Sequence, residues 1–349
     1  MKTFLIINGG RQGPPGEALL RGLSECVDLA GPGGRVAVST SVAHARELVA
    51  EAAAGGFEAL WMGGGDGTVN VLLNAALEAR CPDGRPPDWA LGVVPMGTVN
   101  ALARALRLPL KPVPAARALA TATPRRYDLG RVNGRHFLCF ASVGFDAAVV
   151  HDVGVGKLKR VYGKFAYVAA GIAALARLDR IAPFNIEFDD PVMTPAPDSR
   201  SRSKSRWKAV PAVPGPLETV EHPALPSPLR QHGRSLVVSN ISNYAGLDLF
   251  RHVTPDSGSM EAWLVRRRRP DFLTAWVAGL AAGRLPGGAL LRRLARPAVG
   301  HYIVKGFRVD SPEPLFLQVD GEAVELPPDE TRALRFECLP AAARVLVPA

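Results

Sequence analysis

The 349-residue sequence is poor in cysteine and in aromatic residues, and each shortage excludes a class of protein. Its four cysteines lie far apart and form no C-x-x-C pair, so the sequence offers neither a zinc-binding motif nor a disulfide framework. This cysteine usage fits a reducing compartment. Aromatic residues make up 7% of the chain, and nowhere do they alternate with basic residues as in an RNA-binding sheet. We therefore expect no nucleic-acid partner.

Long apolar runs are also missing. The longest, at residues 165–176, is closed by a basic residue at each end and is shorter than the ~20 residues that span a bilayer. The apolar run at residues 4–7 is too short for a signal peptide. We therefore expect a cytoplasmic protein, with any membrane contact peripheral and at the inner face.

Basic residues, in contrast, are in surplus. The 42 Lys and Arg residues exceed the 32 Asp and Glu residues, which gives a net charge of +10 and a pI near 9.8. Such a charge favours anionic partners such as nucleotides or acidic lipid headgroups, and it serves solubility equally well. Hydrophobic residues make up 47% of the chain, enough to bury real cores, and the length suggests two domains.

The first 128 residues alternate between strand-like and helix-like patterns. Strands are predicted at residues 4–7, 34–38, 59–62 and 90–94, and helices at 43–54, 69–79 and 101–106. Strands separated by helices form a parallel sheet with helices on both faces, and ligands bind at the carboxyl ends of such strands. We therefore expect residues 1–128 to form an α/β nucleotide-binding domain.

Residues 129–349 predict a β-rich domain, which we expect to be a β-sandwich. Strands are predicted at 135–140, 185–188, 236–239, 260–265, 301–304 and 315–319. Nine prolines fall between residues 191 and 228, beside a run of alternating serine and basic residues. We therefore expect residues 190–233 to be a flexible insertion without strands or helices. The sequence leaves open that the last segment of the chain returns to the first domain.

Three turns in the first half end predicted strands and carry the candidate site residues. They are Asn8-Gly9-Gly10, Gly63 to Thr68, and Pro95 to Asn100. Glycines let backbone N–H groups approach a phosphate closely, and the helix N-termini behind the turns add a positive dipole. Thr68 and Thr98 supply hydroxyl groups, and Asp66 supplies an acceptor for a ribose, a proton or a magnesium ion. One such turn is equally a tight strand-to-helix link, but three that converge favour a nucleotide site.

No standard nucleotide motif accounts for these turns. The P-loop pattern G-x-x-x-x-G-K-[ST] is absent, residues 63–68 do not satisfy G-x-G-x-x-G, and the protein-kinase signatures are missing. These absences exclude a P-loop NTPase and count against a dinucleotide oxidoreductase.

Several motifs together resemble the diacylglycerol kinase catalytic-domain family, which includes bacterial lipid kinases and sphingosine and ceramide kinases. They are GGDGTVN at residues 64–70, PMGTVN at 95–100, VGFDA at 143–147, GKFAY at 163–167, the strand end at 240–246, and DGE at 320–322. The first motif alone is shared with NAD kinases. The set in this order spans nearly the whole chain except the proline-rich insertion.

The resemblance implies transfer of the γ-phosphoryl group of ATP, with Mg2+, to a lipid hydroxyl at a membrane surface. It also implies an active site in the cleft between the two domains. Glu322 would accept the hydroxyl proton, with support from Asp320. The oligomeric state stays open, a homodimer included. The residues that would hold the nucleotide are Asn8, Thr40, Gly64, Gly65, Asp66, Gly67, Thr68, Asn70, Gly97, Thr98 and Asn100.

Asp320-Gly321 has a second interpretation, because Asp-Gly is the commonest signature of a tight β-hairpin. The catalytic interpretation requires the two carboxylates to face one side, where their repulsion would raise one pKa toward the range of a general base. Both interpretations remain open from the sequence.

The chain also departs from the family pattern. Carboxylates are missing at Val71, Ala101 and Ser257, which leaves Asp256 as the candidate metal ligand. Two alternatives remain. One is an NAD kinase-like phosphotransferase, because NAD kinases share the first motif. The other is a nucleotide- or lipid-binding regulator with weakened catalysis, because these carboxylates are missing. The basic segments 266–269 and 290–296 are candidates for resting on an anionic bilayer, or equally for flanking a buried helix.

Overall fold

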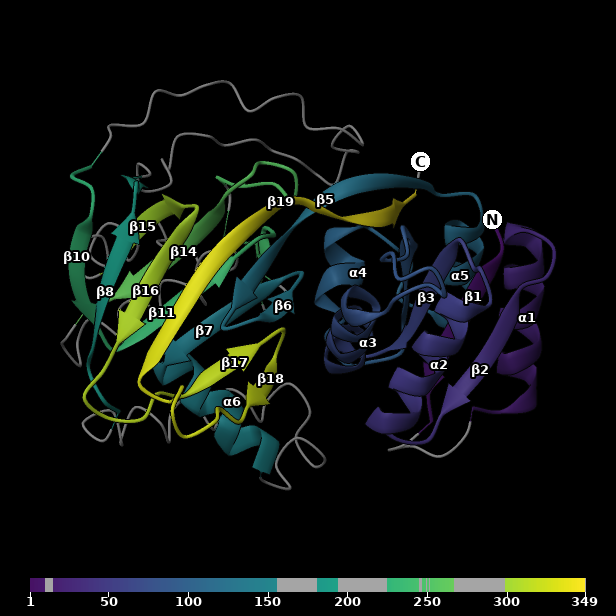
Figure 1. Cartoon of the computed structure of the whole chain (residues 1–349), viewed down its shortest axis with the longest axis horizontal. Helices are drawn as coiled ribbons and strands as arrows, with labels where there is room; N and C mark the ends of the chain where they lie inside the picture. Colours follow the sequence, from purple (N-terminus) through teal and green to yellow (C-terminus); the bar gives the residue numbers. More distant parts are fainter. Residues whose placement is uncertain are drawn as a thin grey trace, which may run out of the picture.

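The computed structural model describes residues 1–9, 15–155, 181–193, 225–244, 247–248, 250, 252–266 and 299–348. The motif at 163–167 and the basic segment at 290–296 lie outside the described residues, as does most of the basic segment at 266–269. The described chain forms an α/β half and a β-rich half that lie side by side (Figure 1). Among the described residues, no helix combines the length and apolar character needed to cross a bilayer.

The α/β half is built on four parallel strands in the order β2-β1-β3-β4. Strands β3 and β4 are buried along their entire length, as expected for strands covered by helices on both faces. Helix α1 packs with α5, and α2 packs with α3. The elements are β1 (Thr3–Asn8), α1 (Glu17–Ala30), β2 (Arg35–Ser39), α2 (Val42–Ala54), β3 (Ala59–Gly64), α3 (Asp66–Glu78), β4 (Ala90–Pro95), α4 (Ala101–Ala105) and α5 (Pro112–Ala120).

The β-rich half is a sandwich. A seven-stranded sheet, in the order β18-β17-β7-β11-β14-β15-β9, packs against the antiparallel part of a ten-stranded sheet. Phenylalanines fill the interior, and the rings of Phe307 and Phe336 stack with centroids 4.5 Å apart. The predicted fold class, an α/β domain plus a β-sandwich, is therefore confirmed.

The strands and helix of this half follow one another closely along the chain. They are β5 (Thr123–Val132), β6 (Arg135–Phe137), β7 (Phe140–Gly144), α6 (Phe145–Val155), β8 (Phe184–Asp189), β9 (Val192–Met193), β10 (Leu229–Gly233), β11 (Ser235–Ser239), β12 (Asn243–Tyr244), β13 (Leu247–Asp248), β14 (Met260–Val265), β15 (Val299–Val304), β16 (Gly306–Asp310), β17 (Leu317–Val319), β18 (Glu322–Val324) and β19 (Ala333–Val347).

The expectation that residues 190–233 contain no strand is wrong at both ends of that range. Strand β9 pairs with β15, and β10 pairs with β8 over five residues. A proline cannot donate to a ladder, but the residues that directly follow Pro191 and Pro228 contain no proline and join existing sheets. Residues 194–224 lie outside the described part.

Strand β19 joins the two halves. Its first residues pair with β16, residues 336–339 and 343–347 pair with β5, and Arg344 and Val345 pair in parallel with β4 of the first half. Figure 1 shows β19 and β5 crossing together from one half to the other. Their register shifts between Leu339 and Ala343, where the buried Asp128 carboxylate accepts the N–H of Ala341 at 2.8 Å. The last segment of the chain thus returns to the first half.

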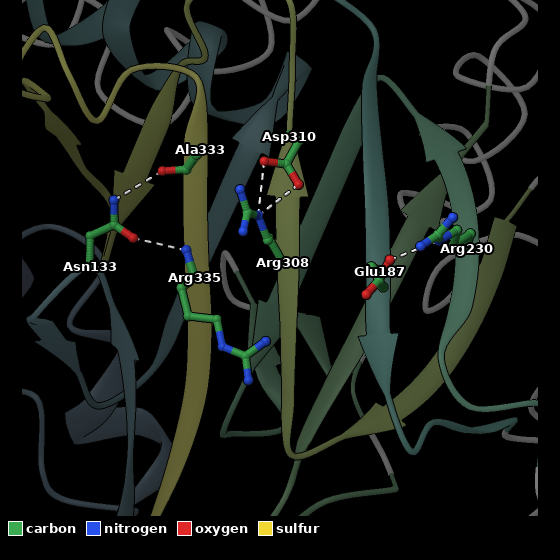
Figure 2. A network of polar contacts seen from close by, with 7 residues as sticks. All are labelled: Asn133, Glu187, Arg230, Arg308, Asp310, Ala333 and Arg335. Atoms are coloured by element: carbon green, nitrogen blue, oxygen red, sulfur yellow. Dashed lines mark hydrogen bonds and ion pairs between the residues drawn. The ribbon is translucent and has the colours of Figure 1, made fainter.

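The outer face of the ten-stranded sheet is charged and exposed to solvent (Figure 2). Arg230 pairs with Glu187 at 2.8 Å and Arg308 with Asp310 at 2.9 Å, each on exposed side chains. Such surface pairs contribute about 0–1 kcal/mol each. Positive and negative charges alternate on this face, and its exposed residues serve as control positions for substitutions.

Candidate active site

The three glycine-containing turns converge at one edge of the parallel sheet. Strands β1, β3 and β4 all end there, and direct hydrogen bonds link their turns. Asn8 Nδ2 donates to Thr68 Oγ1 at 2.9 Å, and the N–H of Ala101 donates to Asp66 Oδ1 at 2.7 Å. The N–H of Met96 donates to the carbonyl of Gly64 at 2.8 Å. The turn after β3 therefore lies between the other two.

The glycines of these turns are required by close packing. A Cβ on Gly97 would lie 2.5 Å from the Cα of Gly65, and a Cβ on Gly64 would lie 2.5 Å from the Cβ of Thr68. Asn100 closes its own turn in a left-handed conformation at φ 51, where its side chain bonds both the N–H and the carbonyl of Gly97. The turn backbones thus pack without intervening side chains.

The start of α3 is not capped by its own N-cap residue. Gly65 stands at the N-cap and has no side chain that could accept from the first N–H groups. A helix N-terminus in this state binds anions through its N–H groups and its dipole. Thr98 is exposed beside this point. Thr40 follows β2 at the same sheet edge, and its hydroxyl lies 3.1 Å from Nδ1 of His44.

The β17–β18 hairpin brings Glu322 onto this helix start. Asp320 and Gly321 form its two-residue turn with φ values of 49 and 83, the conformation of a type I′ hairpin. The Glu322 side chain lies directly against Gly67, since a Cβ on that glycine would come within 2.5 Å of Oε1. Two motifs separated by 250 residues thus meet across the two halves of the molecule.

Asp320 points inward and is occupied by protein donors. Its carboxylate accepts three consecutive backbone N–H groups, those of Leu138, Cys139 and Phe140, at 2.9–3.2 Å, and the Asn70 amide at 2.9 Å. Successive N–H groups of this kind form an anion-binding nest. The side chain is 4% exposed. Asp320 was expected beside Glu322 at a strand end, but the hairpin turn separates the two carboxylates, and we assign Asp320 to positioning.

Helix α3 is clamped to the β-rich half by two asparagines one turn apart. Asn70 and Asn74 each donate to the carbonyl of His136, and Asn74 Oδ1 accepts the His136 N–H at 2.9 Å. The Asn70 amide is thus engaged by contacts within the protein, and the expectation that Asn70 also contacts the nucleotide stays a prediction. The i, i+4 spacing of the two asparagines was readable in the sequence, whereas their partner His136 was not.

Buried charge accumulates where the two halves meet. Burial, and then the Asp320 carboxylate, raise the pKa of Asp66 to about 6, although the N–H of Ala101 opposes the shift. Burial also raises the pKa of Asp320, against the lowering effect of its backbone N–H donors. The Cys139 thiol between them has a pKa well above its ordinary value, through burial and both carboxylates. Asp66 and Asp320 therefore lie close enough to interact.

Asp256 does not join this cluster through any contact that the structure shows. Its carboxylate accepts the Thr254 hydroxyl at 2.6 Å, and its charge acts on Tyr127 and Asp128. Among the residues that the structure describes, no group of three or more His, Cys, Asp or Glu side chains could hold a metal ion. The described side chains thus do not fit a magnesium site made by the protein alone, and we assign no magnesium ligand.

The fold and the site define a protein in which three strand-end turns meet at one edge of an α/β half and a β-sandwich half presents an acidic hairpin to that edge. Residues 2–132 match the model of the diacylglycerol kinase catalytic domain. The resemblance to that family, which the sequence motifs indicate, is confirmed.

Known relatives agree with this match. The chain is 35% identical over 177 residues to a protein of Pseudomonas aeruginosa named "Probable lipid kinase YegS-like", an alignment of 51% of this chain and 55% of that protein. It is 36% identical over 152 residues to the diacylglycerol kinase of Bacillus subtilis, which covers 43% and 48% of the two chains. The chain thus spans about half the length of these relatives.

A solved structure extends the likeness in fold to the whole chain. The crystal structure of a diacylglycerol kinase from Bacillus anthracis aligns over 99% of this chain and 96% of that one, with a TM-score of 0.59 and 15% identity. At this identity the comparison supports the architecture alone.

Proposed function

We propose that this protein is an ATP-dependent lipid kinase that transfers the γ-phosphoryl group to the hydroxyl of a diacylglycerol-like lipid. One observation carries the proposal: Glu322 lies against Gly67 at the start of α3, so a proton acceptor adjoins a helix N-terminus, the kind of position that binds phosphate. Phosphoryl transfer depends mainly on positioning and on neutralising charge, with one proton to accept. The helix N-terminus and the Glu322 carboxylate support a phosphate position and a proton acceptor.

In the proposed reaction, the lipid hydroxyl oxygen attacks the γ-phosphorus, and the bond from that phosphorus to the β-phosphate oxygen breaks to release ADP. Glu322 accepts the hydroxyl proton. The turns at Gly64–Thr68 and Gly97–Thr98 hold the phosphates through backbone N–H groups and hydroxyls, with Asn8 and Thr40 at the same edge. Mg2+ commonly enters such sites bound to nucleotide phosphates, whose charge it neutralises. No step is assigned to it here.

The lipid substrate places the reaction at a membrane surface, which we propose the protein reaches from the cytoplasm as a peripheral partner. The net charge of +10 supports attraction to anionic headgroups. Mixed vesicles with and without phosphatidylserine test this directly. We expect cosedimentation with the anionic vesicles that weakens as salt is raised, because the attraction is electrostatic.

The function is tested by supplying labelled ATP and Mg2+ with a panel of lipids. We expect phosphorylation of a diacylglycerol-like lipid and a fall of at least ~100-fold in turnover in Glu322→Gln, as is typical when a general base is removed. Glu187→Gln, on the exposed outer face of the sheet (Figure 2), is the matched control and should keep wild-type turnover. Equal turnover in the Glu322 variant would reject the role of Glu322.

Two alternatives are decided by the same assay. NAD included in the panel tests the NAD kinase-like function, since it would then be phosphorylated in place of lipid. The missing carboxylates at Val71 and Ala101 motivate a regulator that binds ATP without turnover. That alternative predicts saturable ATP binding and no labelled product with any acceptor.

A further inference from the structure

A half-buried arginine, Arg135, lies near the charges of the hairpin that carries Glu322. Arg135 opens β6, immediately before the His136 backbone that α3 clamps. Its Nη2 donates to Asn70 Oδ1 at 3.1 Å. Its Nε is buried and has no hydrogen-bond partner within the described part of the chain. A buried donor without a partner is costly, so Nε is the feature of this side chain that needs an explanation.

The charges around Arg135 are those of the proposed active site. Burial lowers the pKa of its guanidinium, while the Asp320 and Glu322 carboxylates act in the opposite direction and Arg46 of α2 adds to the lowering. Two elements therefore supply the charges near the guanidinium: the β17–β18 hairpin and α2. Asp66 on α3 interacts with the same Asp320.

The Asn70 amide connects these groups. Its oxygen accepts from Arg135, and its nitrogen donates to Asp320 at 2.9 Å, two residues before Glu322. A planar guanidinium fixed at one nitrogen presents its other donors at set positions, which a lysine cannot do. Catalytic hydrogen bonds are often long or misaligned before substrates bind and tighten in the complex. This accounts for an Nε that lies beside the hairpin without a partner.

We propose that Arg135 is a positioning residue for Glu322: anchored by Asn70, its guanidinium orients the Glu322 carboxylate over Gly67 toward the lipid hydroxyl. This inference rests on the proposed lipid kinase function. Arg135 acts on Glu322 and contacts neither the nucleotide nor the lipid. Removing its positive charge takes away an interaction that favours a carboxylate over a carboxylic acid.

The test compares Arg135→Met and Arg135→Lys with Arg308→Met, whose arginine lies on the exposed outer face (Figure 2). We expect Arg135→Met to lower kcat by about 10- to 100-fold, the range for loss of support to a general base. The acid limb of its kcat/KM profile should move to higher pH, with the KM for ATP unchanged. Arg135→Lys should keep the acid limb in place and lose less turnover, and Arg308→Met should match the wild type.

Other outcomes overturn the inference. They are a wild-type kcat and pH profile in Arg135→Met, or a rise in the KM for ATP with kcat intact, which would make Arg135 a phosphate ligand. If thermal melts show that Arg135→Met does not fold, Arg135→Gln and Arg135→Lys decide, and equal profiles in these two variants overturn the inference. If the wild-type protein phosphorylates no lipid, the proposed lipid kinase function itself is wrong. That outcome differs from the outcomes that overturn only the role of Arg135.

Discussion

The side chain of Glu322 rests on the backbone of Gly67, close enough that a Cβ at position 67 would lie within 2.5 Å of its Oε1. The glycine belongs to the first turn of α3, and the glutamate follows the turn of the β17–β18 hairpin. This contact closes the proposed active site, because it sets a carboxylate from the second half of the chain beside the phosphate-binding edge of the first.

Gly67→Ala tests this contact without adding or removing a charge. The new methyl group would push Glu322 away from the start of α3, so we expect turnover to fall by about 100-fold, a loss comparable to that of a misplaced catalytic group. Alanine favours a helix over glycine by up to about 1 kcal/mol, which offsets the cost of displacing the Glu322 side chain. The melting temperature should therefore stay level or fall only slightly. Thermal melts and the lipid kinase assay on the same preparation measure both effects.

Gly16→Ala is the control for that substitution, since nothing lies within 4 Å of a Cβ at position 16. It should leave turnover at the wild-type level. Wild-type turnover in Gly67→Ala would show that the position of Glu322 over this glycine has no part in the reaction.

Substitutions of Asp320 and of Glu322 should have different effects: the first should lower stability, and the second should lower activity. Asp320→Ala leaves three buried backbone N–H groups and the Asn70 amide without their acceptor, and each unsatisfied group costs about 1–3 kcal/mol. We therefore expect the free energy of unfolding to fall by at least about 3 kcal/mol, measured by urea denaturation. Glu322→Gln should change it by less than about 1 kcal/mol.

The exposed Asp310 provides the reference for that comparison. Asp310→Ala removes only a surface pair with Arg308 and should cost about 0–1 kcal/mol. An Asp320→Ala protein as stable as Asp310→Ala would contradict the role of Asp320 as the anchor of the hairpin.

The sequence alone was sufficient to predict the sheet edge. Strands β3 and β4 are continuous apolar runs because helices cover both of their faces, and parallel strands end at one edge, so their turns must converge. The hairpin interpretation of Asp320-Gly321 is confirmed by the type I′ turn, which sends Asp320 into its nest, while the catalytic role of Glu322 stays a prediction.

Other parts could not be predicted, because their partners are distant in the sequence. Strand β19 is interrupted at Leu339–Ala343, and it is stabilised by pairing with β5 and β4, more than 200 residues earlier. Strand β5 begins with four exposed residues and lacks the apolar alternation of a half-buried strand. The N–H groups that hold Asp320 belong to backbone, which no side-chain motif reveals.

Asp66→Asn is expected to stabilise the protein while it weakens catalysis. The pKa of Asp66 is about 6 in the folded chain, against an ordinary value of 3.8, because burial and the Asp320 charge disfavour its carboxylate. The folded state thus binds this proton more tightly than the unfolded state does. The resulting penalty is absent below about pH 4, grows from pH 4 to 6, and is complete above pH 6.

An asparagine removes that penalty and keeps an oxygen for the N–H of Ala101. Urea denaturation at pH 8 should therefore show Asp66→Asn about 1–3 kcal/mol more stable than the wild type, with the difference vanishing near pH 4. Turnover at pH 8 should fall at least ~100-fold, because the resemblance places Asp66 among the residues that hold the nucleotide. Asp310→Asn, exposed on the outer sheet face, should show neither effect. A variant that loses stability equally at every pH would mean that Asp66 is held mainly by its bond to Ala101, and the pH-dependent penalty would be refuted.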